Sequence, residues 1–88
     1  MRPTIDELGA RLSAALPGAR FEVIDESHLH AGHAGAQGGA GHFRVRIAAR
    51  QFEGLGTVAR HRLVYDSVRD WMPDRIHALS IDAQLPDR

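Results

Sequence analysis

The stretch that decides the fold is His42-Phe43-Arg44-Val45-Arg46-Ile47-Ala48-Ala49-Arg50, in which apolar and polar side chains alternate. Alternation with a period of two is typical of a β-strand that buries only one of its faces. The apolar side begins with Phe43. His42 falls on the other side, so we expect it to be an exposed histidine at the rim of a sheet. The pattern therefore predicts a strand over 42–50 in a sheet covered on one face.

Before this strand, the sequence predicts a helix, a first strand and a loop. Thr4-Ile5-Asp6-Glu7 has the form of a capping box, and apolar residues follow it at helical spacing as far as Leu16. Pro17-Gly18 ends this helix, and a strand follows over 20–25. The segment from about 28 to 41 contains five glycines, which predicts a flexible loop because each glycine is costly to order.

After the central strand, the sequence predicts a second helix and a third strand. Thr57 is the expected N-cap of a helix from Val58 to about Asp70, and a strand follows over 76–81. The order is α-β-β-α-β, an α+β arrangement. We therefore expect one domain over residues 1–88, with a three-stranded sheet and helices on one face.

The composition limits the possible functions. The 88 residues carry 11 arginines and no lysine against 11 acidic residues, so the formal net charge is zero. The absence of cysteine excludes a disulfide framework and a thiolate metal cage made by this chain alone. No stretch approaches the ~20 apolar residues of a membrane helix, and the N-terminus does not resemble a signal peptide. We expect a soluble cytoplasmic protein. Neither a nucleophile motif nor a phosphate-binding glycine motif is present, so we do not expect an enzyme.

Two parts of the sequence offer histidines that could bind a metal, a cluster of three in the loop and a single one in the last strand. His28, His30 and His33 fall within six residues at the start of the glycine-rich loop, and His77 opens the last predicted strand. Imidazole is the commonest metal ligand in proteins. The three loop histidines could bind zinc together, at a large ordering cost, or could simply be solvated. A lone strand histidine such as His77 could equally have a structural role.

Several short motifs resemble the BolA family. They extend over nearly the whole chain and are Glu26-Ser27-x-x-His30, Gly41-His42-Phe43-Arg44-Val45, Arg50-Gln51-Phe52-Glu53-Gly54-Leu55, Arg60-His61-Arg62-Leu63-Val64-Tyr65 and Ile76-His77-Ala78-Leu79. The resemblance implies an α-β-β-α-β fold similar to the type II KH arrangement.

The resemblance also implies partnership with a monothiol glutaredoxin and a role in handling [2Fe-2S] clusters. The family ligands match His30 in the loop and His77 in the last strand, and His28 or His33 could substitute for His30. Because the chain has no thiolate, glutaredoxin and its glutathione would supply the remaining ligands. We expect no cluster in the isolated chain. Two histidine ligands raise the reduction potential of such a cluster.

The second function implied by the resemblance is DNA binding in transcriptional regulation. Residues 42–62 contain five arginines and one glutamate, a local charge of +4. The candidate phosphate contacts are Arg44, Arg46, Arg60, His61 and Arg62. Binding through such contacts would depend steeply on salt. A weak homodimer is a further expectation.

Overall fold

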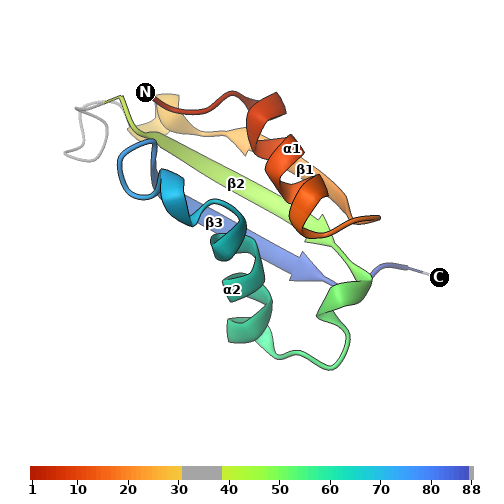
Figure 1. Cartoon of the computed structure of the whole chain (residues 1–88). Coiled ribbons are helices and arrows are strands. Elements are labelled where there is room, and N and C mark those ends of the chain that lie inside the picture. Colours follow the sequence, from red (N-terminus) through yellow and green to blue (C-terminus); the bar gives the residue numbers. More distant parts are fainter. Residues whose placement is uncertain (31–38, 88) are drawn as a thin grey trace.

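The computed structural model describes residues 1–30 and 39–87, with His30 described by its backbone alone. The expected α+β class and the α-β-β-α-β order are confirmed. The elements in chain order are α1 (Ile5–Ala15), β1 (Arg20–Asp25), the 3-10 helix η1 (Ser27–His30), β2 (Gly41–Ala48), η3 (Arg50–Phe52), α2 (Thr57–Ser67), η4 (Arg69–Trp71) and β3 (Ile76–Gln84) (Figure 1).

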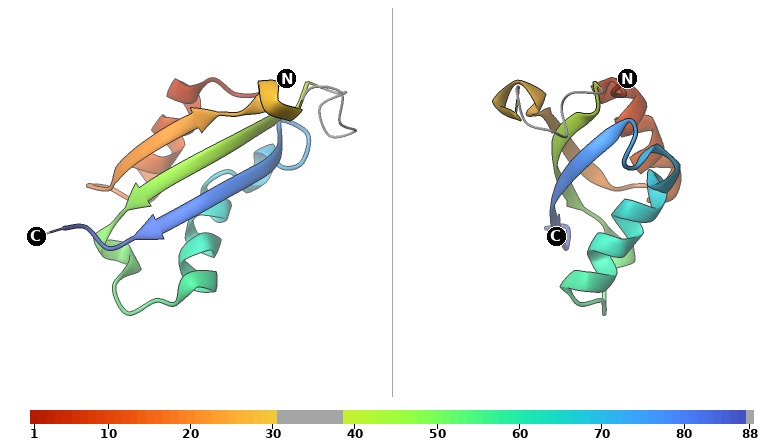
Figure 2. Two further views of the ribbon diagram at one scale, coloured as in Figure 1. Left: turned by 180° about the vertical axis from the view of Figure 1, so that it is seen from behind. Right: turned by 90° about the vertical axis from the view of Figure 1, so that its left-hand side faces the viewer.

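The sheet has the order β1-β2-β3, with the alternating strand β2 at its centre. β1 pairs with β2 in the antiparallel direction, and β3 pairs with β2 in the parallel direction. α1 and α2 both cover the same face of the sheet, and the other face is open, as Figure 2 shows. The apolar side of β2 is buried beneath these helices, which contribute Leu8, Leu12 and Val64 to the core, and Val68 follows at the end of α2.

The first helix begins as the sequence predicts. The Thr4 hydroxyl accepts a hydrogen bond from the Glu7 N–H (3.0 Å), and the Glu7 carboxylate accepts one from the Thr4 N–H (2.9 Å). The backbone hydrogen bond from Thr4, helped by Arg75, lowers the pKa of Glu7. This capping box satisfies two otherwise unpaired helix donors and so determines where α1 begins.

Four sequence predictions need correction at the element boundaries. α2 begins at Thr57 with Gly56 as its N-cap, and it ends at Ser67 rather than near Asp70. β2 ends at Ala48 rather than at Arg50, and β3 extends to Gln84 because pairing with β2 continues that far. The predicted loop over 28–41 is shorter, since 28–30 belong to η1 and Gly41 begins β2; residues 31–38 lie outside the described part.

Trp71, in η4, packs between an arginine of α1 and an arginine that precedes β3. The Arg11 guanidinium lies 3.9 Å from the centre of its ring, and the Arg75 guanidinium lies 4.8 Å from it. Arg11 also donates to both carboxylate oxygens of Asp70, at 2.7 and 3.1 Å. α1 is thereby attached to the segment that follows α2. Within residues 1–30 and 39–87, no helix is both long enough and apolar enough to span a bilayer.

Candidate functional site

The strand directions bring three histidine-bearing segments to one end of the sheet. Because β1 is antiparallel to β2, the residues that follow β1 lie beside the beginning of β2, and the parallel strand β3 begins at the same end. Figure 2 shows η1 and the beginnings of β2 and β3 gathered there. The segment that ends at His30 and the strand that carries His77 therefore lie at the same end of the sheet, on either side of the beginning of β2.

Two hydrogen bonds attach Glu26 and Ser27, at the start of η1, to the backbone of His42 in β2. The Glu26 N–H donates to the carbonyl of His42 (2.8 Å), and the His42 N–H donates to the hydroxyl of Ser27 (3.1 Å). The Ser27 N–H in turn donates to Asp25 (2.9 Å). Ser27 is buried, so this link is shielded from water. Ser27, which lies three residues before His30, is thus held against the sheet.

His77 is exposed at the beginning of β3. The register between β2 and β3 is irregular here, because Gly41 pairs with Ile76 and His42 already pairs with Ala78. The preceding residue, Ile76, is completely buried in the core. The backbone of His77 is therefore held by the sheet, while its imidazole is accessible to a ligand or partner.

His42 differs from the sequence prediction, because it is buried with 5% of its surface exposed. Arg44 and Arg46 follow on the same side of β2 and are exposed, as alternation predicts. His42 is buried because η1 packs against the beginning of β2 and removes this end of the open face from solvent. The His42 ring lies against the His77 ring, with 5.2 Å between the centroids and 50° between the planes.

The remaining loop histidines are only partly described. His28 is exposed on η1, and His33 lies outside the described residues. Within the described ranges, no group of three or more His, Cys, Asp or Glu residues is arranged to hold a metal ion. The zinc site considered for His28, His30 and His33 stays a prediction.

The carboxylates beside the histidines are paired with arginines. Asp25 lies 3.2 Å from Arg2, and Glu26 lies 3.1 Å from Arg44. Burial alone would raise the pKa of Asp25, but hydrogen bonds from Ser27 and the charge of Arg2 outweigh burial and lower it. Because both carboxylates already have cationic partners, the imidazoles are the accessible donors at this end of the sheet.

The expected DNA-binding residues do not form one surface. Arg44 and Arg46 lie on the open face of the sheet, whereas Arg60, His61 and Arg62 belong to α2, which covers the opposite face (Figure 2). Arg44 is paired with Glu26. The Arg60 guanidinium donates to the carbonyls of Leu55 (2.8 Å) and Ala83 (3.3 Å), so it holds α2 against β3. The local charge of residues 42–62 is therefore divided between two faces.

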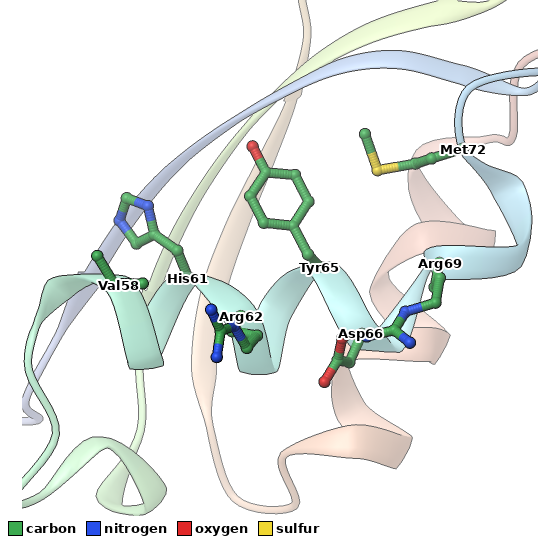
Figure 3. Close-up of a pocket in the computed structure, with 7 residues that line it drawn as sticks. All are labelled: Val58, His61, Arg62, Tyr65, Asp66, Arg69 and Met72. Atoms are coloured by element: carbon green, nitrogen blue, oxygen red, sulfur yellow. Dashed lines mark hydrogen bonds and ion pairs between the residues drawn. The ribbon is translucent and has the colours of Figure 1, made fainter.

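A shallow groove runs along α2 (Figure 3). In Figure 3, Tyr65 and His61 project from α2 toward β3. The Tyr65 hydroxyl donates to the Leu79 carbonyl on β3 (2.8 Å). Asp66 pairs with Arg69, and Arg62 has no carboxylate partner among the residues that the structure describes. The groove is lined by Val58, His61, Arg62, Tyr65, Asp66, Arg69 and Met72.

Comparisons with known proteins agree with the fold and the motifs. A family model described as BolA-like protein matches residues 12–88. The SufE-like protein 1 of Arabidopsis thaliana is 43% identical over 86% of this chain, and the protein BOLA1 of the same plant is 40% identical over 86%. The chain spans 22% and 49% of the lengths of these two relatives. The solved structure of Arabidopsis BolA1 superposes with a TM-score of 0.78 and 36% identity, covering 98% of this chain and 95% of that one.

Proposed function

Because this chain belongs to the BolA-like protein family, we propose that it binds a monothiol glutaredoxin and supplies two imidazole ligands to a shared [2Fe-2S] cluster. The ligands in this proposal are His30 and His77. The observation that carries it is the position of the exposed His77, at the same end of the sheet as the segment that ends in His30.

The donor set of the chain fits a shared cluster better than a cluster held alone. A [2Fe-2S] cluster needs four terminal ligands, and two histidines can replace two cysteines on one iron. The chain contains no cysteine, and within residues 1–30 and 39–87 no larger group of metal ligands is assembled. The two thiolates for the other iron would come from the glutaredoxin and its glutathione. With two histidine ligands, the cluster would have a higher reduction potential than one with four thiolates.

The two ligands should differ in how well the chain tolerates their loss. His77 lies on β3 directly after the buried Ile76, and the neighbouring imidazole of His42 is itself buried. His30 has His28 and His33 close to it in the sequence, and either of these could substitute. Replacement of His77 should therefore be the more damaging change.

The test is reconstitution of the chain with glutaredoxin, glutathione, iron and sulfide, followed by visible absorption and circular dichroism. We expect His77→Ala to abolish the spectrum of the mixed complex and to leave the far-ultraviolet spectrum unchanged, because His77 is exposed. His30→Ala should weaken the spectrum, and His30→Cys should keep a cluster with a lower potential. His61→Ala is the matched control, since it removes a histidine from α2. A wild-type spectrum from His77→Ala would disprove the ligand assignment.

A further inference from the structure

His42 contacts both segments that carry the proposed ligands. Its backbone accepts a hydrogen bond from the Glu26 N–H (2.8 Å) and donates one to the Ser27 hydroxyl (3.1 Å), at the base of η1. Its ring lies 5.2 Å from the ring of His77. His42 thus touches the base of η1 through its backbone and His77 through its side chain.

We infer that His42 is a positioning residue that sets the direction of the His77 imidazole relative to the segment leading to His30. This inference rests on the proposed function. An exposed histidine ordinarily samples several rotamers, whereas a ring packed against a buried neighbour loses part of that freedom. Outer groups that orient metal ligands through hydrogen bonds typically contribute 10- to 100-fold to metal affinity, which sets an upper bound for a group that orients a ligand by packing.

A ligand role for His42 itself is disfavoured by its burial. Only 5% of its surface is exposed, and both ring nitrogens are shielded from solvent. An iron shared with a second protein would have to approach from outside, where His77 is exposed. The buried ring therefore acts as a wall behind the ligand.

Two substitutions separate these roles. His42→Phe keeps a flat ring behind His77 and removes both nitrogens, whereas His42→Ala removes the ring. If His42 positions His77, the phenylalanine variant should keep the spectrum of the mixed complex, and the alanine variant should bind the cluster more weakly, by up to about 100-fold. Loss of the cluster in both variants would show that the ring nitrogens are required and would overturn positioning by the flat ring. Wild-type affinity in both would overturn it as well.

A second measurement uses the chain without cluster or partner. Carbon-13 relaxation of the His77 ring, in samples checked for folding by far-ultraviolet circular dichroism, should show larger ring motion in His42→Ala than in the wild type or in His42→Phe. Arg46→Ala is the control, because Arg46 lies on the same face of β2 but farther along the strand. Unchanged His77 motion in a folded His42→Ala variant would disprove positioning. A wild-type chain that forms no cluster would instead refute the proposed function, while the ring motion would still decide the role of His42.

Discussion

Gly41 is the residue whose substitution tests most directly how the sheet supports the candidate site. A methyl group at this position would lie 2.4 and 3.0 Å from two ring carbons of Phe43, and 2.9 Å from Cβ of Arg2. Favourable contacts between carbon atoms begin at about 3.5 Å, so the closest approach is short by about 1 Å. Phe43 is only 2% exposed and has no open space to move into.

Gly41→Ala should therefore destabilise the chain by about 1–3 kcal/mol, as overpacking of a core does. For a domain of this size, each kcal/mol corresponds to about 4–8 °C in Tm. The assay is chemical and thermal unfolding followed by far-ultraviolet circular dichroism. Gly41 directly precedes His42, so the backbone movement that relieves this clash should also alter the contact between the rings of His42 and His77. This change should be visible in the NMR chemical shifts of the His77 ring.

Gly56→Ala is the matched control for this substitution. A methyl group there meets no atom within 4 Å, and the backbone φ of −77° suits alanine. We expect the free energy of unfolding to change by less than about 1 kcal/mol in Gly56→Ala. The loss of glycine at the N-cap is partly offset because alanine reduces the entropy of the unfolded chain. Equal stability of the two variants would refute the packing argument.

Two further predictions concern charge. Hydrogen bonds from Arg11 lower the pKa of Asp70, and the backbone hydrogen bond from Thr4 lowers the pKa of Glu7. A carboxyl group whose pKa is lowered by folding stabilises the folded chain at a pH above its unfolded pKa of about 4. This stabilisation is lost as the pH falls through the folded pKa. The Tm should therefore fall as the pH drops below about 4–5, and it should fall less steeply in Arg11→Met. An identical dependence of Tm on acid pH in that variant would contradict the pairing of Arg11 with Asp70. If the chain binds DNA, Arg62→Ala should reduce the salt slope by about 1 unit, whereas Arg60→Ala should also lower stability, because Arg60 supports β3. A salt slope unaffected by either variant would exclude α2 as the DNA-binding surface.

Most of the fold is predictable because its signals are local. The alternation of β2 and the capping box of α1 depend on neighbouring residues, and both are confirmed. The end of α2 is less predictable, since apolar spacing continues past Ser67 to Trp71 while the backbone has already left the α-helix. The extra residues of β3 arise from pairing with β2, which the sequence of β3 alone does not reveal.

The place of His77 near the beginning of the last strand was also predictable from the sequence, and the structure shows the residue exposed there. The burial of His42 was not. Its place in the alternation of β2 is that of an exposed residue, and only the packing of η1, a segment predicted as loop, removes it from water. The segment Asp25–His30 has Leu29 as its one apolar residue, so it gives no periodic apolar signal from which such packing could be foreseen.

Charge pairing around the site distinguishes the two functions that the resemblance implies. Arg2 and Arg44 are each paired with a carboxylate beside the histidine segment, and the formal net charge of the chain is zero. A partner that docks at this end of the sheet meets little uncompensated charge, so long-range steering should contribute little to its association. DNA, in contrast, would exchange its condensed counterions for unpaired cationic side chains, and the basic residues of 42–62 that would provide them are divided between two faces. Weak salt dependence therefore follows from a protein partner bound through ligands, and steep salt dependence from a nucleic acid bound through α2.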